Sequence, residues 1–235
     1  MAKTLSEIWL VILASWLLVP VAGSWLVSAI IEKVNQRLMQ RFGNNSLVVL
    51  SGLGVMVHEL SHALVALIFL HKVTRLVLLQ RPFVKDHAGK MGYVAHTWNK
   101  QSQYQQIGNF FIGIAPVFGI SLAMVGVTQL LWPSLLQVQT QLTAVLINEP
   151  WWKMLLWLFI VINLLTAVSL SKSDWQGAGS GVFSYIVFLT LVTIGITLLK
   201  LVSLTQLVAW LWLVVAFFAL LLSMSIILYI ITRFI

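Results

Sequence analysis

Residues 46–70 read SLVVLSGLGVMVHELSHALVALIFL, and this stretch decides how the chain is interpreted. Its length and hydrophobicity are typical of a helix that crosses a membrane, yet its centre carries His58, Glu59 and His62. Residues four apart share one face of a helix. The two imidazoles can therefore hold one zinc ion, and Glu59 lies beside them as a candidate general base.

Chance is a poor explanation for this HExxH pattern. With five His and four Glu in 235 residues, random placement gives about 0.001 matches. Ionisable side chains inside a membrane cost about 2.5 to 3.5 kcal/mol each and mark functional sites. Three such groups within five residues need a partner, which we expect to be a metal ion. A buried polar network without metal is the alternative.

The composition indicates an all-α polytopic membrane protein. Hydrophobic residues make up 60% of the chain, charged residues make up 9%, and the mean hydropathy is +0.98. Soluble domains carry roughly 25% charged residues. We interpret residues 1–235 as one integral membrane domain with room for about six transmembrane helices. Because the chain has no cysteine, any metal must be held by His, Asp or Glu.

Six apolar stretches are the predicted spans: residues 5–31, 46–70, 104–131, 151–170, 181–202 and 207–231. The first resembles a signal peptide in part, because Lys3 precedes an apolar run. That run exceeds a typical signal sequence, and we interpret it as an uncleaved helix. Pro20 and Gly23 predict a kink in it.

Basic residues indicate the orientation. The connection after the second span contains six of them: Lys72, Arg75, Arg81, Lys85, Lys90 and Lys100. Residues 132–150 contain no Lys or Arg. The positive-inside rule places the basic connection in the cytoplasm, and six spans place both termini there as well. Lys33, Arg37 and Arg41 disagree, because this topology puts them outside.

The composition also suggests a location and a partner. Strong positive-inside character without a transit peptide suits a multi-pass protein of a cell membrane, and a bacterial plasma membrane in particular. The net charge of +8 favours contact with anionic lipids of the bilayer. Nucleic acid is not an expected partner, because no basic and aromatic binding motif is present.

The cytoplasmic loop, residues 73–100, has a different character from the spans. Two stretches rich in β-branched or aromatic residues, 74–80 and 92–98, flank a turn-like segment and predict a β-hairpin. Such a hairpin could receive an extended substrate by edge pairing; an ordinary loop is the alternative. We interpret His87 and His96, which lie here, as surface histidines rather than metal ligands.

A catalytic zinc site takes a third protein ligand and leaves one position for water. Glu7 and Glu32 flank the first span, Asp86 lies in the basic loop, and Glu149 begins the outer end of the fourth span. Asp174 follows the fourth span directly and returns to the cytoplasmic side. It is therefore the predicted third ligand. A solvated carboxylate at a helix boundary is the alternative.

With these residues in place, the chain resembles the site-2 protease group, peptidase family M50, over residues 46–177. That group of intramembrane zinc metalloproteases combines HExxH on one transmembrane helix, a strand-containing cytoplasmic loop and a later Asp on another helix. The resemblance implies His58, His62 and Asp174 as zinc ligands and Glu59 as the catalytic residue.

The sequence around Asp174 departs from the pattern of that group. The family Asp usually follows an Asn-Pro pair and lies in a Leu-Asp-Gly sequence, whereas residues 171–177 read SKSDWQG. Asn163, upstream on the same span, resembles the family Asn and could hydrogen-bond the substrate backbone. A helix-packing amide is the alternative interpretation of Asn163.

Small residues predict close helix packing at two places. Residues 108–119, GNFFIGIAPVFG, let neighbouring helices approach, or Pro116 could open a water or substrate path. Ser51, Gly52 and Gly54 predict close contact between the motif helix and the span that precedes the third ligand.

These features together predict hydrolysis of peptide bonds in membrane-spanning or membrane-tethered substrates. Zinc would activate a water molecule, and Glu59 would accept its proton before passing it to the leaving amine. The alternative is a non-proteolytic membrane protein with a metal site. It could be a transporter, although no internal repeat is visible, or a protease-derived chaperone or assembly factor, although Glu59 is intact.

Overall fold

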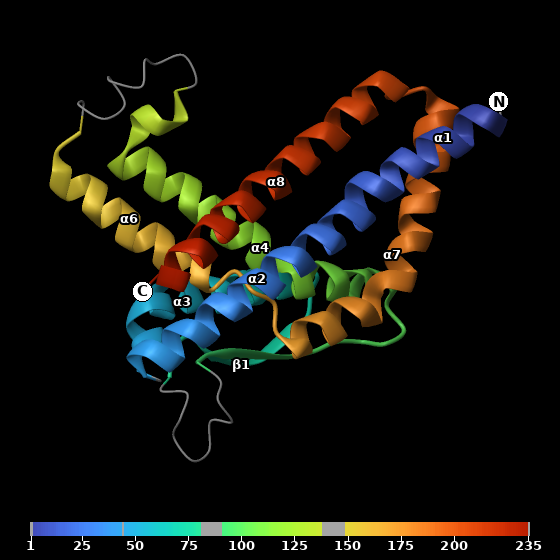
Figure 1. Ribbon diagram of the computed structural model, residues 1–235. Coiled ribbons are helices and arrows are strands. Elements are labelled where there is room, and N and C mark those ends of the chain that lie inside the picture. Colours follow the sequence, from blue (N-terminus) through green and yellow to red (C-terminus); the bar gives the residue numbers. More distant parts are fainter. Residues whose placement is uncertain (1, 44, 81–90, 138–148, 235) are drawn as a thin grey trace.

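The computed structural model describes residues 2–43, 45–80, 91–137 and 149–234 and is mainly helical (Figure 1). In chain order, the helices are α1 (Ala2–Leu13), α2 (Val19–Phe42), α3 (Ser46–Ile68), α4 (Gln103–Leu131), α6 (Trp151–Thr166), α7 (Lys172–Leu199) and α8 (Leu204–Phe234). A π-helical turn, Ala14–Leu18, joins α1 to α2, and a 3₁₀ turn, Pro133–Leu136, follows α4. The strands are β1 (Lys72–Val77) and β2 (Tyr93–Thr97).

Five described helices are long and apolar enough to cross a membrane: Leu5–Phe42, Ser46–Ile68, Gln103–Leu131, Lys172–Leu199 and Leu204–Phe234. The predicted fourth span, α6, is apolar but has only 16 residues. Large apolar side chains cover the outer faces of α7 and α8, where Phe183 is 79% and Leu213 is 69% exposed. Such a surface fits lipid rather than water. The predicted class, an all-α membrane protein with a small hairpin, is confirmed.

Helices α7 and α8 contact the first long helix around Pro20 and Gly23. Pro20 has no N–H and cannot donate to the carbonyl of Trp16, four residues earlier. That carbonyl accepts a hydrogen bond from the Tyr185 hydroxyl of α7 at 3.0 Å. A Cβ at Gly23 would lie 2.3 Å from the ring of Phe218 in α8. The two residues that predict a kink thus hold α7 and α8 against the first helix.

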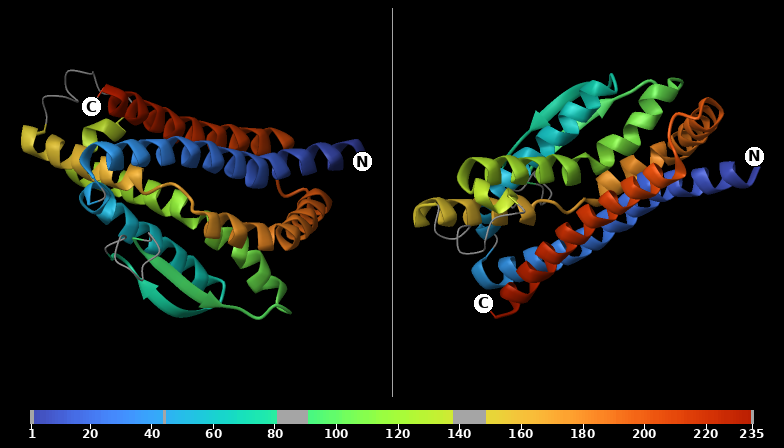
Figure 2. Two further views of the ribbon diagram at one scale, coloured as in Figure 1. Left: turned by 60° about the horizontal axis from the view of Figure 1, so that its bottom comes forward. Right: turned by 90° about the horizontal axis from the view of Figure 1, so that it is seen from above.

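The first and last long helices lie side by side and run in the same direction (Figure 2). Gly23 contacts Phe218, and further along both helices Arg37 donates to the carbonyl of Tyr229 at 3.1 Å. The two termini therefore lie at opposite ends of this pair. In a six-span topology the first and last spans would be antiparallel. The parallel pair differs from that arrangement, and the side of a membrane that each terminus faces stays a prediction.

Cysteine labelling can test this parallel arrangement, because the chain contains no cysteine of its own. Glu7 and Phe234 are both exposed, near the two ends of the chain. We expect a membrane-impermeant maleimide to label only one of the single variants Glu7→Cys and Phe234→Cys in sealed, right-side-out vesicles. Detergent should make both reactive. Labelling of both positions from one side of intact vesicles would contradict the arrangement.

Helix α3, which carries the HExxH motif, packs closely against α6. A Cβ at Gly54 would lie 2.2 Å from the carbonyl oxygen of Asn163, so only glycine allows this approach. One turn earlier, Ser51 Oγ donates to Thr166 Oγ1 at 2.9 Å. The predicted contact with the span before the third ligand is confirmed for Ser51 and Gly54. Gly52 instead faces the segment that follows β1.

Helix α4 packs against both α3 and α7 through its glycines. A Cβ at Gly119 would lie 2.0 Å from Ser61 Oγ of α3. A Cβ at Gly113 would lie 2.6 Å from the Cβ of Ala178 in α7. The predicted role of the glycine-rich span in close packing is confirmed. As a result, α3, α4 and the junction of α6 with α7 meet at one point in the interior.

The end of α3 turns the chain into the hairpin. Leu70 has a left-handed backbone with φ of 58°, its N–H bonds the carbonyl of Leu67, and the His71 N–H bonds the carbonyl of Ala66 at 2.8 Å. This is the Schellman arrangement, which satisfies carbonyls left free at the end of a helix. It directs the following residues into β1.

Strands β1 and β2 form an antiparallel pair, as predicted. Lys72 lies opposite Thr97 and Val77 lies opposite Tyr93, with a register shift early in β1. The turn-like segment predicted between them lies outside the described residues. Among the residues that the structure describes, β1 and β2 pair only with each other, each along one edge.

Candidate metal centre

Helix α3 presents the motif side chains to the interior. His58, Glu59 and His62 are each at most 8% exposed. The helical spacing stacks the two imidazoles one turn apart, with His58 Nε2 and His62 Nε2 separated by 3.1 Å. The shared helix face that the sequence predicts is therefore present.

Asp174 lies in the first turn of α7, where Ser171 is the N-cap residue. The Ser171 N–H donates to Asp174 Oδ2 at 2.7 Å, and the Asp174 N–H donates to Ser171 Oγ at 3.3 Å. This reciprocal capping fixes the carboxylate, and the positive end of the helix dipole favours its negative charge. The side chain is 14% exposed. Asp174 is therefore mostly buried in the first turn of a helix, and the alternative interpretation of a solvated carboxylate does not apply.

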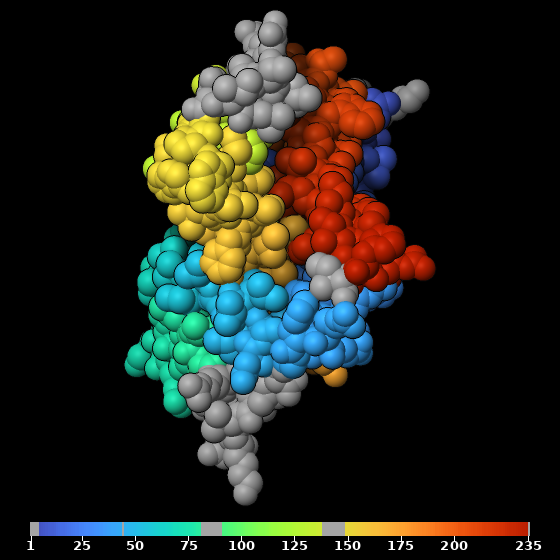
Figure 3. All heavy atoms as spheres, turned by 60° about the vertical axis from the view of Figure 1, so that its left-hand side comes forward, coloured from blue at the N-terminus to red at the C-terminus, as the bar shows by residue number. Residues whose placement is uncertain are grey.

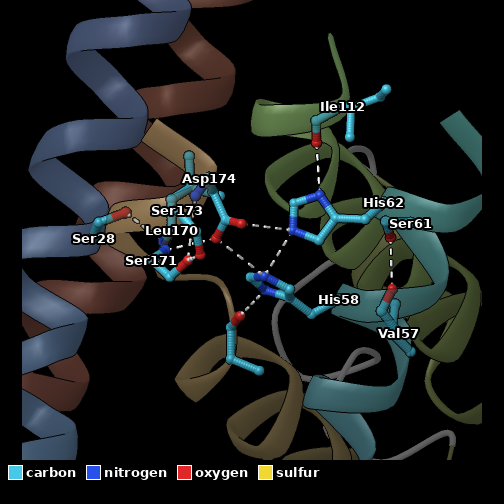
Figure 4. A network of polar contacts seen from close by, with 11 residues as sticks. Ser28, Val57, His58, Ser61, His62, Ile112, Leu170, Ser171, Ser173 and Asp174 are labelled. Carbon is cyan, nitrogen blue, oxygen red and sulfur yellow. Dashed lines mark hydrogen bonds and ion pairs between the residues drawn. The ribbon is translucent and has the colours of Figure 1, made fainter. Parts of the chain in front are cut away.

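The three predicted ligands converge (Figure 4). His62 Nε2 lies 3.2 Å from Asp174 Oδ1, and His58 Nε2 lies 3.6 Å from Asp174 Oδ2. Zinc ligands about 2.0 to 2.1 Å from the ion at tetrahedral angles are themselves about 3.3 to 3.4 Å apart. The two imidazole nitrogens are 3.1 Å apart, and each lies 3.2 or 3.6 Å from one oxygen of the Asp174 carboxylate, which is close to this value. These donors fit a zinc ion.

Backbone carbonyls orient both imidazoles. His58 Nδ1 donates to the carbonyl of Ala167 at 2.8 Å, and His62 Nδ1 donates to the carbonyl of Ile112 at 2.7 Å. A proton on Nδ1 leaves a lone pair on Nε2 of each neutral ring. The two lone pairs point toward each other and toward the carboxylate of Asp174. Three electron-rich atoms in this arrangement repel one another unless a metal ion or a shared proton lies between them.

The two carbonyls are available because neither has a partner in its own helix. Ala167 is the C-cap residue of α6, where helix carbonyls lack a following N–H. Ile112 lies four residues before Pro116, which has no N–H to donate back. The sequence interpretation gave Pro116 a role in packing or in a water path. The structure assigns it a further one, because Pro116 frees the carbonyl that orients His62.

Replacing Pro116 by Ala should therefore weaken zinc binding. The new N–H would compete with His62 Nδ1 for the carbonyl of Ile112. We expect the zinc affinity to fall about 10- to 100-fold, the range seen when a metal-bound His loses its second partner. Competition with a fluorescent chelator measures this affinity. Gly126→Ala is the matched control, because it lies on the same helix and a Cβ there meets nothing within 4 Å. Equal affinities in both variants would contradict the role of Pro116.

A cavity of about 580 Å³ opens beside the three ligands. Glu59 and Asp174 line one part of it, and residues 91–96, which include most of β2, line another. A Cβ at Gly92 would lie 2.7 Å from Glu59 Cγ and 2.9 Å from the carbonyl of Val77. Glycine at this position lets the hairpin lie directly against Glu59. The cavity can thus present an extended chain to the motif side chains.

Two asparagines that the sequence interpretation missed also line the cavity. Asn109 of α4 is 3% exposed and lines the cavity beside Ile112 and Gly113. Asn35 of α2 donates to the carbonyl of Thr166 at 2.9 Å, while its buried Oδ1 has no partner within the described part of the chain. A lone amide within an apolar stretch is the signal that could have identified Asn109.

Asn163, the predicted substrate-binding residue, is not brought to the cavity. It is 1% exposed, and its Nδ2 donates to the carbonyl of Val49 at 2.6 Å. Its Oδ1 accepts the N–H of Gly54 at 3.1 Å. Both ends of the amide are used to hold α6 against α3, which are the contacts of a helix-packing residue.

His96 differs from the surface residue that the sequence suggested. It is half-buried, its Nδ1 lies 3.0 Å from Nδ1 of His71, and Trp98 packs against both rings. Burial, with a smaller effect from His71, lowers the pKa of His96 to about 4. Its imidazole is therefore neutral near pH 7. It lines the cavity but is not one of the converging ligands, and His87 lies outside the described residues.

Comparison with known proteins identifies no relative of this chain. No family model matches the chain, and searches of curated proteins and of solved structures find no similar protein. The class of protein that the fold defines is a multi-pass helical membrane protein with a buried cluster of two His and one Asp. Any closer identity depends on the chemistry that these residues can perform.

Proposed function

We propose that the protein is a membrane-embedded zinc metalloprotease of the site-2 protease kind. The observation that carries the proposal is the convergence of His58, His62 and Asp174 beside Glu59 at the wall of a cavity. Three protein ligands leave one zinc position for water, which is the pattern of catalytic rather than structural sites.

A metal ion accounts for the ligand geometry better than a proton-linked network does. A proton can join one pair of the three facing groups, whereas one metal ion would serve His58 Nε2, His62 Nε2 and the Asp174 carboxylate together. Imidazole and carboxylate ligands suit zinc. The carbonyls of Ala167 and Ile112 hold the rings as the outer partners of metal-bound histidines commonly do.

Glu59 is the proposed general base. A bound zinc would supply Lewis acidity to a water molecule and to the scissile carbonyl. Glu59 would accept the proton of that water and pass it to the leaving nitrogen. Its position suits this task, because it follows His58 directly in α3 and lines the same cavity. At 8% exposure, it is also shielded from bulk water and lipid.

The cavity suits an extended polypeptide as substrate. A transmembrane helix must unwind before a protease can reach its carbonyls, because helical backbone groups bond one another. The edge of β2 that does not pair with β1 can pair with such an unwound segment. The amide of Asn109 and the unpartnered Oδ1 of Asn35 at the cavity wall offer further backbone contacts. The proposed substrates are therefore membrane-spanning or membrane-tethered peptides.

The proposed location is a cell membrane, with the hairpin loop in the cytoplasm. Lys72, Arg75 and Lys100 lie in the described parts of the connection between α3 and α4. The positive-inside rule assigns such a basic connection to the cytoplasmic side. The parallel first and last helices then leave only one terminus on that side.

Reconstitution tests the proposal. The purified, zinc-loaded protein would be placed in liposomes with a panel of membrane-spanning peptides that carry a donor and a quencher fluorophore. We expect cleavage that a chelator stops and added zinc restores. A parallel measurement follows zinc entry into liposomes loaded with a zinc-sensitive dye. Zinc entry without cleavage of any peptide would contradict the proposal and favour a transporter.

A further inference from the structure

A second hollow, separate from the cavity at the metal centre, lies where α2 and α8 end. Its volume is about 470 Å³, and its lining is mostly cationic or polar: Arg37, Gln40, Arg41, Thr232, Arg233 and Phe234. The last turns of α8 lie directly against the end of α2 on the surface (Figure 3). Three guanidinium groups from two helices thus surround one hollow.

The positive charge of this hollow has no counter-ion on the described part of the chain. No acidic residue is among those that line the hollow, and none of the ion pairs among the described residues involves Arg37, Arg41 or Arg233. Arg41 and Arg233 also occupy the last turns of α2 and α8, where helix dipoles favour cations. Two helix ends supply only about one negative charge in total against three guanidinium groups. Counted over the described residues, the lining of the hollow therefore keeps a net positive charge.

Arg37 is held in a fixed orientation within this hollow. Its Nη1 donates to the carbonyl of Tyr229 at 3.1 Å, and its Nη2 donates to the Tyr229 hydroxyl at 2.8 Å. The guanidinium also lies 4.0 Å from the centroid of the Tyr229 ring. A guanidinium has five N–H donors, so three remain for a ligand. A planar donor set that is already oriented suits the oxygens of a phosphate group.

We propose that this hollow binds a phosphate group, as carried by the head group of an anionic phospholipid. Arg233 directly follows the apolar run of α8, which places it near the lipid head groups when that helix crosses a bilayer, and Arg37 contacts Tyr229 one turn earlier. The proposal also gives a local reason for Arg37 and Arg41, which disagree with the positive-inside rule. A bound lipid would hold α2 and α8 together where their ends meet.

The test titrates the delipidated, full-length protein in detergent with three probes: dioctanoyl phosphatidylglycerol, dioctanoyl phosphatidylcholine and inorganic phosphate. Native mass spectrometry counts bound molecules. We expect wild-type protein to bind one phosphatidylglycerol at least tenfold more tightly than phosphatidylcholine. The double variant Arg41→Gln/Arg233→Gln should lose this preference. Both side chains are exposed, so their removal leaves the contacts of Arg37 intact. Lys200→Gln removes one exposed cation elsewhere and should bind like wild type.

Inorganic phosphate distinguishes the two sources of the phosphate group. Displacement of phosphatidylglycerol by millimolar phosphate would assign the hollow to phosphate from either source, whereas no displacement would assign it to the lipid. The melting temperature should rise with phosphatidylglycerol in wild type but not in the double variant. Equal binding of the two lipids by wild type, or an unchanged preference in a double variant that melts normally without lipid, would overturn the proposal.

Discussion

Replacing Glu59 by Gln is expected to abolish peptide hydrolysis while the protein keeps its zinc. Gln has nearly the shape of Glu and can still fill the space beside Gly92, but it cannot accept a proton. Removing a positioned general base lowers rates about 10²- to 10⁴-fold. Cleavage of a reconstituted membrane-spanning peptide and zinc content by elemental analysis would be measured on the same preparation.

The matched control for this variant is Glu32→Gln, which changes an exposed glutamate outside the cavity. It should cleave at the wild-type rate. The Glu59 variant should also bind the peptide as wild type does, because the loss concerns proton transfer rather than binding. Cleavage retained in zinc-loaded Glu59→Gln would refute the assigned chemistry, even if the metal site itself proved correct.

Much of the candidate site could be predicted because it depends on local spacing. The i, i+4 relation of His58 and His62 fixes a shared helix face wherever the helix lies in the fold. Asp174 could be found by elimination, because a chain with six acidic residues offers few alternatives. The two strands were predicted for a similar reason, since their β-branched and aromatic residues contrast with the spans around them.

The outer partners of the histidines could not be predicted, because they depend on how distant helices meet. The carbonyls of Ile112 and Ala167 carry no side-chain signal, and only the packing of α4 and α6 against α3 brings them to the imidazoles. Asn163 illustrates the same limit of spacing arguments. Its position on the span was identified, but its amide faces α3 rather than the cavity.

The direction of the first and last helices also depends on tertiary packing. Counting apolar stretches gave six spans, and an even number implies two termini on one side. The short α6 and the parallel contacts of Gly23 and Arg37 along α8 are decided by side-chain fit at positions far apart in sequence. A hydropathy average over a window of residues contains no information on such side-chain contacts.

Replacing Asp174 by Asn is expected to remove stoichiometric zinc without unfolding the start of α7. The Asn side-chain oxygen can still accept the Ser171 N–H, so the helix cap should survive. The anionic ligand is lost, and two neutral imidazoles remain. We expect the zinc affinity to fall by more than the roughly 100-fold upper range for loss of an outer partner. Elemental analysis and chelator competition measure it.

His58→Ala should lose zinc as completely as Asp174→Asn, because both changes remove a direct ligand. Ser173→Ala is the control, since Ser173 lies next to Asp174 and lines the cavity but bonds only Ser171 in the cluster. Two contrary results, one in Asp174→Asn and one in the wild-type protein, would separate the remaining interpretations of the cluster. Stoichiometric zinc in Asp174→Asn would mean that a residue other than Asp174 is the third ligand. Wild-type protein that takes up no stoichiometric metal would instead require protons to bridge the facing nitrogens, and no hydrolytic role for Glu59 would follow.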